Sequence, residues 1–179
     1  MEYIGKRISV KKTEEEISIV ILAFADKIKN RILTAWFIIW TICGIIVFSQ
    51  YFVMKQENEK VMILVWLFFW AYFEYKSFAV FMWRKFGVEK IKIRKGMLQY
   101  KRDRAGKGKV NEYKVEFIKD LEYKEPDDNS FFDNLNNSYW VVGGERIVFD
   151  YYGRRIKLGM QLGEEDAKKL MKLISKHVG

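Results

Sequence analysis

The chain has 179 residues, and its 32 basic and 23 acidic side chains give a formal charge of +9. This length allows one domain, or a membrane anchor with one small domain. A single cysteine, Cys43, excludes a disulfide within the chain, and a single histidine, His177, argues against catalysis centred on histidine.

Apolar and charged residues are segregated along the chain. Of the 30 aromatic side chains, 17 fall between Trp36 and Phe86, in a stretch that holds few charges. The regions on either side are rich in lysine, arginine, aspartate and glutamate. This segregation predicts an apolar anchor joined to a charged domain.

The first 31 residues are predicted to form a short strand and an amphipathic helix. Residues 3–10 alternate in hydropathy, as strands do. Thr13 and Glu16 have the spacing of a capping box, which favours a helix over residues 14–30. Its apolar side chains at helical spacing are Ile17, Val20, Ile21, Phe24 and Ile28. We expect this apolar stripe to lie either on the membrane surface or against the chain's own charged domain.

Two long apolar segments predict a transmembrane helical hairpin over residues 32–86. Residues 32–54 hold no aspartate, glutamate, lysine or arginine. As a helix they would span about 34 Å, which is enough to cross a hydrocarbon core of about 30 Å. After a polar break at residues 55–60, residues 61–83 form the second segment, interrupted by Glu74 and Lys76.

Basic residues flank the two predicted spans mostly on one side. Three precede the first span and six follow the second, whereas the connecting turn holds only Lys55 and Lys60. Because positively charged flanks tend to stay in the cytoplasm, both termini are expected to be cytoplasmic.

From residue 87 the apolar period changes to two, which predicts strands in residues 87–179. The expected extended stretches are residues 90–94, 97–102, 111–116, 117–123, 139–142, 145–151 and 154–160. Gly143-Gly144 and Tyr152-Gly153 fall between such stretches and indicate hairpin turns. Acidic residues at 164–166 start a final amphipathic helix, so we expect an α+β domain.

The order of these elements resembles that of a pleckstrin-homology-like domain. Three short patterns carry the resemblance: residues 140–147 (WVVGGERI), 149–154 (FDYYGR) and 158–162 (LGMQL). The whole chain resembles bacterial membrane proteins in which two helices precede such a domain. This resemblance implies a seven-stranded antiparallel barrel or sandwich capped by a C-terminal helix. It also implies a binding, scaffolding or assembly module rather than an enzyme.

Two ionisable residues lie within the second predicted span. Glu74 is about 3 Å along the helix axis from the middle of the span, where a carboxylate is costly unless it is paired, protonated or facing protein. Lys76 is two residues away, about 200° around the helix, so the two side chains do not pair directly. Three interpretations remain open: a structural glutamate, which includes one at an interface with another membrane subunit; a span that places Glu74 nearer the headgroups; or ion or proton movement.

A basic segment at residues 101–109 is the candidate contact for anionic lipid. Its five cations are Lys101, Arg102, Arg104, Lys107 and Lys109. Cations near an anionic leaflet are attracted to it, although a solvated hairpin loop would carry the same residues. Nucleic acid is not expected as a partner because no reading module accompanies the charge.

A polar loop over residues 125–137 is the candidate site for partner docking. The apolar residues in and after it are Phe131, Phe132, Leu135 and Trp140. They either cover the edge of the sheet or form a docking patch, since such loops vary around a fixed scaffold. Asp127, Asp128 and Asp133 lack the spacing of an EF-hand calcium loop.

These features predict a non-enzymatic scaffold or accessory subunit of a membrane complex. The expected location is the bacterial inner (cytoplasmic) membrane, as a multi-pass protein. Its expected partners are the lipid bilayer and other membrane subunits or copies of itself, and no cofactor is expected. The alternatives are an anionic-lipid-binding tether or sensor, and a small channel or transporter subunit that uses Glu74.

Overall fold

The structure is a computed structural model, and it describes residues 1–23, 27–125 and 141–178. The chain divides into two compact units. The first, which we call the sheet domain, combines Met1–Ala25 with Lys85–Gly179. The second, which we call the helical hairpin, is Asp26–Arg84. Residues 1–25 therefore belong with the C-terminal strands rather than forming a segment of their own.

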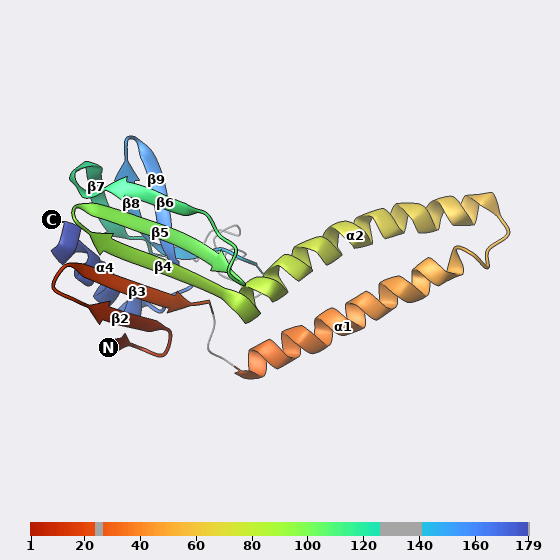
Figure 1. The fold of residues 1–179 in the computed structure, drawn as a ribbon. Coiled ribbons are helices and arrows are strands. Elements are labelled where there is room, and N and C mark those ends of the chain that lie inside the picture. The colour runs from red at the N-terminus through yellow and green to blue at the C-terminus, as the bar shows by residue number, and fades with distance from the viewer. Residues whose placement is uncertain (24–26, 126–140, 179) are drawn as a thin grey trace. The chain divides into compact units, whose positions relative to one another are not determined.

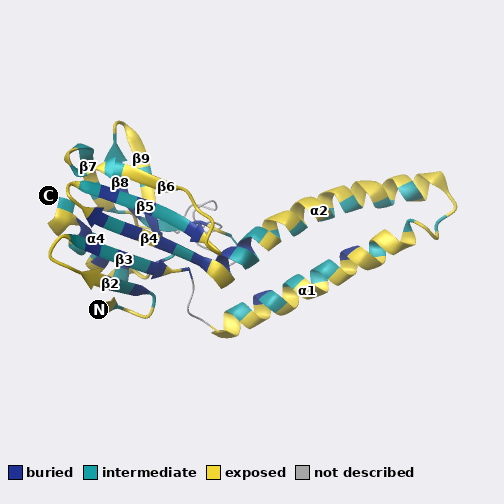
Figure 2. Cartoon of the chain, in the orientation of Figure 1, coloured by how far each residue is buried: buried dark blue, intermediate teal, exposed yellow. Residues whose placement is uncertain are grey.

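The helical hairpin consists of α1 (Lys27–Gln50) and α2 (Glu57–Phe86), joined by residues 51–56. By length and composition, both helices are able to cross a membrane. Most of their apolar side chains are exposed (Figure 2), including Ile39 at 62% and Phe68 at 74%. The two helices confirm the predicted helical segments, although each begins four or five residues before the predicted start.

A six-stranded antiparallel sheet forms the larger part of the sheet domain, with its strands in chain order (Figure 1). The strands are β1 (Glu2–Ile4), β2 (Ile8–Lys12), β3 (Glu16–Leu22), β4 (Gly87–Arg94), β5 (Met97–Arg104) and β6 (Val110–Lys114). The whole helical hairpin is inserted in the chain between β3 and β4, which are hydrogen-bonded neighbours.

A three-stranded antiparallel sheet and a helix complete the sheet domain. The short helix η1 (Val115–Phe117) leads into β7 (Ile118–Tyr123), β8 (Glu145–Tyr151) and β9 (Arg154–Met160), and α4 (Glu164–Val178) ends the chain. The predicted bounds of β8 and β9 are confirmed. Apolar residues of both sheets and of α4 form one core, which includes Ile19, Leu98, Phe149 and Leu170, each fully buried.

The amphipathic helix predicted over residues 14–30 is wrong over residues 14–22, whereas residues 27–30 belong to α1. Residues 16–22 form β3, in which Ile17, Ile19 and Ile21 are buried and alternate with more exposed side chains. The Thr13 hydroxyl does not cap a helix but donates to the Glu16 carbonyl at 3.0 Å, across the turn between β2 and β3. The apolar residues of this run fit the spacing of a helix as well as the alternation of a strand, and pairing with β4 selects the strand.

The seven-stranded single barrel is also corrected, although the α+β class, the antiparallel strands and the final helix are confirmed. The described residues contain nine strands in two sheets of six and three. The additional strands come from the N-terminal segment, which supplies β1, β2 and β3. Of the strand predicted at residues 139–142, the described residues Val141 and Val142 lie outside any strand.

Candidate functional site

The chain leaves the sheet domain toward α1 and returns from α2 at one end of the central strands of the six-stranded sheet. Strand β3 ends at Leu22, and β4 begins at Gly87, directly after the last residue of α2. Leu22 lies opposite Val88, and the Ala23 amide donates to the Gly87 carbonyl at 3.0 Å. We call this end of the sheet, which runs across the strand ends from the β1–β2 turn to the β5–β6 turn, the root edge.

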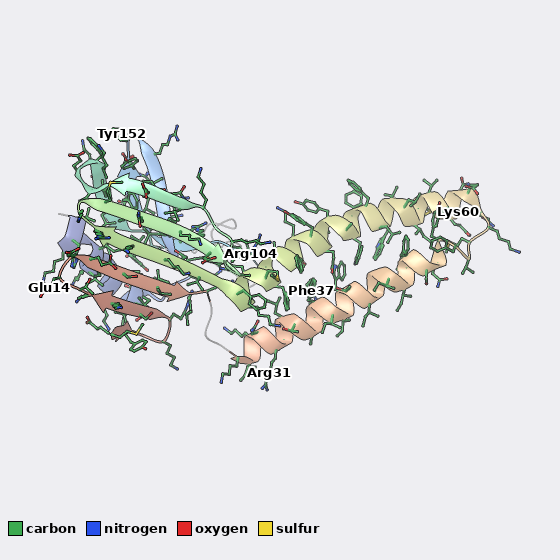
Figure 3. All side chains as sticks on the ribbon, in the orientation of Figure 1. Glu14, Arg31, Phe37, Lys60, Arg104 and Tyr152 are labelled. Atoms are coloured by element: carbon green, nitrogen blue, oxygen red, sulfur yellow. The ribbon has the colours of Figure 1, made fainter. Side chains whose placement is uncertain are left out.

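A basic turn between β5 and β6 lies on the root edge. The register of β4 and β5 places Arg104, which is labelled in Figure 3, opposite the first residue of β4. Backbone hydrogen bonds of 3.0 Å in both directions between Arg104 and Lys107 close the turn, and the Ala105 amide donates to the Phe86 carbonyl at 3.5 Å. The side chains of Arg104, Lys107 and Lys109 are exposed. Three exposed cations therefore lie in or next to a turn that is hydrogen-bonded to Phe86, the last residue of α2.

The structure separates the five cations that the sequence grouped together. Lys101 and Arg102 lie within β5 and not in the turn. The Lys101 ammonium is 3.3 Å from the Asp103 carboxylate, which also accepts a 2.8 Å hydrogen bond from Lys90. Arg102 donates to the Glu145 carboxylate at 2.6 Å. These two cations are engaged in ion pairs with the chain's own carboxylates.

The ion pairs of Asp103 predict a dependence of stability on acid. The hydrogen bond from Lys90 holds the pKa of Asp103 below its ordinary value of 3.8. A carboxyl group with a lowered folded-state pKa stabilises the fold above its unfolded pKa, and this stabilisation is lost as the pH falls through the folded pKa. An Asp103→Asn variant should therefore unfold at a lower temperature than wild type at neutral pH, and its midpoint should fall less steeply below pH 3.8. Thermal unfolding of the full chain in detergent measures both, and an unchanged acid limb would contradict this role.

A buried carboxylate, Glu89, is the third residue of β4 and is 1% exposed. Its Oε1 accepts from the Met160 amide at 2.8 Å, and its Oε2 accepts from the Gly159 amide and the Tyr100 hydroxyl, each at 2.9 Å. Burial, together with the charge of Glu89, raises the pKa of Tyr100 well above its ordinary value, so this hydroxyl stays protonated. Three donors satisfy Glu89 and bind β4 to the end of β9.

Arg7, in the β1–β2 turn, binds the same end of β9. Its guanidinium donates to the carbonyls of Leu22 and Ala23, each at 2.8 Å, at the end of β3. It also donates to the carbonyls of Met160 at 3.0 Å and Gln161 at 2.6 Å. Burial lowers the pKa of Arg7, but a guanidinium remains charged at physiological pH.

Residues 159–161 therefore join the end of β3 to the start of β4. The amides of Gly159 and Met160 donate to Glu89 on β4, and the carbonyls of Met160 and Gln161 accept from Arg7, which also holds the end of β3. Gly159 and Gln161 have φ angles of 74° and 49°, so the chain turns sharply here before α4. We call Arg7, Glu89 and residues 159–161 the root clasp. Sequence reasoning missed all of these residues as a group.

In the helical hairpin, the predicted residue Glu74 faces α1. The Thr41 hydroxyl donates to Glu74 Oε1 at 2.7 Å, whereas Glu74 Oε2 has no hydrogen-bond partner among the described residues. One turn earlier on α2, the Trp70 indole donates to the Trp40 carbonyl at 3.3 Å. A Cβ at Gly44 would lie 2.1 Å from the Trp70 ring, so only glycine allows this contact between α1 and α2.

Lys76 lies on the opposite face of α2. It is exposed, and its ammonium is 5.6 Å from the centroid of the Tyr72 ring, one turn earlier. An apolar groove of about 490 Å³ opens between α1 and α2. The groove is lined by Gly44, Ile45, Phe48, Leu64, Leu67, Phe68, Trp70 and Ala71.

The remaining predicted site falls outside the described residues. It comprises Phe131, Phe132, Leu135 and Trp140, as well as the aspartates of the same loop. Within residues 1–23, 27–125 and 141–178, no three histidine, cysteine, aspartate or glutamate side chains are grouped as metal ligands would be.

Comparisons of the chain with family models, with curated proteins and with solved structures find no match.

Proposed function

We propose that this protein is a non-enzymatic, multi-pass protein of the bacterial inner membrane, anchored by α1 and α2, with both termini in the cytoplasm. The two helices have 24 and 30 residues, which correspond to about 36 Å and about 45 Å and exceed the thickness of a hydrocarbon core. Their exposed apolar side chains suit contact with lipid. The basic residues at the start of α1, Lys27, Lys29 and Arg31, favour a cytoplasmic location for that end.

The sheet domain then acts as a tether that binds anionic lipid through its root edge. The observation that carries this proposal is the backbone hydrogen bond from Ala105 to Phe86, because it fixes the basic turn beside the residue at which α2 ends. With α2 crossing the membrane, we expect Arg104, Lys107 and Lys109 to lie at the level of the lipid headgroups. Each cation close to an anionic leaflet contributes about 1 kcal/mol of attraction.

The order of strands supports a pleckstrin-homology-like module as the basis of this tether. Strands β3–β6 and β7–β9, followed by α4, make seven antiparallel strands and a C-terminal helix. In this description the hairpin is inserted after the first of the seven strands, and β1 and β2 extend the first sheet.

We expect a spin label at residue 105 to report lipid headgroups and a label at residue 95 to report water. Ala105 and Lys95 are matched turn residues with φ angles of 51° and 48°. They flank opposite ends of the eight-residue strand β5, whose end residues are about 23 Å apart at strand geometry. The measurement is the accessibility of each label, in the full chain with Cys43→Ala, to oxygen and to a water-soluble nickel chelate. The chain is placed in nanodiscs of anionic or zwitterionic lipid.

The control replaces Arg104, Lys107 and Lys109 together by glutamine. In anionic nanodiscs this variant should shift the label at residue 105 toward the aqueous value while the label at residue 95 stays unchanged. A water-like signal at residue 105 of the otherwise unmodified chain would overturn the lipid contact. Release of the protein from membranes by alkaline carbonate would overturn the anchor itself.

A second candidate function is a scaffold or accessory subunit of a membrane complex. It is favoured by the charged residues Glu74 and Lys76 of α2, because such residues in a membrane span usually pair with other polar groups. Purification in mild detergent followed by mass spectrometry of co-eluting proteins tests it. Recovery of a lone monomer contradicts it. A channel or transporter role for Glu74 would require a change in ion flux on Glu74→Gln.

A further inference from the structure

Four strands lie at the outer edges of the two sheets, and three of them are protected against pairing with another chain. Strand β1 has only three residues. Strand β7 has a register irregularity between Lys119 and Glu122. The Lys157 carbonyl of β9 accepts a 3.3 Å hydrogen bond from Arg102. Because short, bulged or covered edges do not readily accept a further strand, β6 is the edge that stays open in the described part of the chain.

Strand β6 points the backbone groups of two residues away from its own sheet. At its start, Lys107 exchanges backbone hydrogen bonds of 3.0 Å with the last residue of β5; at its end, the Val115 amide donates at 2.9 Å to the residue before β5. Bonded and non-bonded residues alternate along an antiparallel pair, and both ends place Val110 and Glu112 among the non-bonded residues. Their amides and carbonyls therefore face outward from a strand that is mostly exposed (Figure 2).

The open part of β6 ends where the two sheets meet. The Lys114 amide donates to the Tyr151 hydroxyl of β8 at 3.4 Å, and the centroids of the Tyr113 and Tyr151 rings are 5.0 Å apart. Before this point the Val110 side chain is 46% exposed. The free edge therefore offers two backbone donors and two acceptors beside an exposed apolar side chain, which is what an extended peptide needs in order to add as a further strand.

The charges along β6 favour an acidic partner. Lys107, Lys109 and Lys114 lie in or next to β6 and are exposed. Among the described residues Lys107 and Lys109 form no ion pair, and the Lys114 ammonium is 3.9 Å from the exposed Glu116 carboxylate. The carboxylate of β6 itself, Glu112, accepts from a glutamine amide of β5 at 2.8 Å. A second copy of the chain would bring the same excess of lysines to the contact, whereas an acidic segment complements it.

We propose that β6 binds an extended acidic segment of a partner protein, which adds as an antiparallel strand beside Val110 and Glu112. Antiparallel pairing continues the pattern of the whole sheet. It runs the segment from Lys114 toward Lys107, so that acidic side chains in its C-terminal half meet Lys109 and Lys107. Backbone hydrogen bonds hold the segment, and the charges select it.

The inference goes beyond the proposed function, because the backbone of β6 plays no part in the lipid contact. Lys107 and Lys109 also belong to the basic turn, so anionic lipid and an acidic segment compete for the same charges. Lipid composition therefore separates the two partners, and zwitterionic lipid leaves these lysines to the peptide.

Binding of a synthetic peptide to the full chain in zwitterionic nanodiscs tests the proposal. The probe EVTTVETE, with blocked ends and a fluorescent label, places its glutamates opposite Lys114, Lys109 and Lys107 in the antiparallel register. Fluorescence anisotropy should give saturable binding. At a probe concentration of about ten times the dissociation constant, hydrogen exchange at the amides of Val110 and Glu112 should slow about tenfold, because the unbound fraction falls to about one tenth.

Two altered probes separate backbone pairing from charge without changing the protein. Proline at the third and fifth positions removes the two amides that donate to the carbonyls of Glu112 and Val110, and this probe should not bind. Lysine in place of the three glutamates should also abolish binding, because it places like charges opposite the lysines of β6.

Val110→Pro is the matched change on the chain. It removes an amide that faces away from β5, where proline is compatible with an edge strand, and it should weaken probe binding about tenfold or more. Lys109→Glu should also weaken binding, whereas Lys176→Glu, which alters an exposed lysine of α4, should leave it unchanged. Slow exchange at the amides of Asn111 and Tyr113, which bond to β5, shows that β6 is intact in each variant.

The inference is overturned by the absence of saturable binding, by equal binding of the proline or lysine probes, or by protection elsewhere while Val110 and Glu112 exchange as before. Protection of these two amides that rises with the concentration of the chain alone would identify a second copy as the occupant and would also overturn it. The label at residue 105 reports the lipid contact independently of all these outcomes.

Discussion

Replacing Glu89 by alanine should destabilise the sheet domain by about 3–5 kcal/mol, which is a large fraction of the stability of a typical domain. The substitution leaves the amides of Gly159 and Met160 and the hydroxyl of Tyr100 without their acceptor in a site that is 1% exposed. It also removes the negative charge that balances Arg7. Unsatisfied buried donors are costly, and so is an uncompensated buried charge.

Denaturant unfolding of the full chain in detergent, followed by hydrogen exchange of peptides from β4 and β9, measures this loss. Glu122→Ala is the matched control, because Glu122 is an exposed carboxylate of the same domain, and it should change the stability by no more than about 0.5 kcal/mol. The loss of stability in Glu89→Gln should fall between those of Glu89→Ala and Glu122→Ala. The amide group of glutamine retains one acceptor oxygen but presents a donor to the remaining backbone amides. Equal stability of Glu89→Ala and wild type would show that the root clasp does not hold the fold.

Local patterns were sufficient to predict the elements whose neighbours in space are also neighbours in sequence. The two helices followed from long apolar segments, of which residues 32–54 hold no charged side chain and residues 61–83 hold only Glu74 and Lys76. The hairpin of β8 and β9 followed from alternating apolar residues around Tyr152-Gly153, and its bounds are those observed. In these cases the information needed to form the element lies within the element or in its immediate neighbour along the chain.

Elements that depend on distant partners could not be predicted in the same way. The residues of β3 fit a helix as well as a strand, and the choice is made by β4, whose Ile91 pairs with Ile19 across the inserted hairpin. The root edge exists only because of this pairing. The sequence therefore indicated the cations of the basic turn but not their position beside Phe86, nor the separate ion pairs of Lys101 and Arg102.

The sequence contains one signal for the root clasp. Glu89 alternates with Ile91 and Ile93, so it occupies an inward position on a strand whose other inward residues are buried. A carboxylate at such a position must find donors, because burying an unpaired charge is prohibitive. Two of its three donors, however, are backbone amides 70 and 71 residues away, which side-chain patterns do not reveal.

Replacing Arg7 by methionine should destabilise the sheet domain by about 3 kcal/mol or more, because it leaves buried carbonyls at the ends of β3 and β9 without a donor. It also removes one of the two arginines whose charge balances Glu89, the other being Arg102. Arg7→Lys should recover only part of this loss. An ammonium offers three donors from one point, whereas the guanidinium spreads its donors over two separate segments of backbone.

The coupling between Arg7 and Glu89 distinguishes a clasp from two independent contacts. Both residues hold residues 159–161, so once one is removed the segment is already released and the second substitution has less to break. The double variant R7M/E89A should therefore lose less free energy of unfolding than the sum of the two single losses, with an interaction energy of about 1 kcal/mol or more. Hydrogen exchange should show the same order, with faster exchange at Gly159 and Met160 in either single variant. Strict additivity would mean that the strand leading into α1 and the strand leading out of α2 are held separately, and that the root clasp is not one unit.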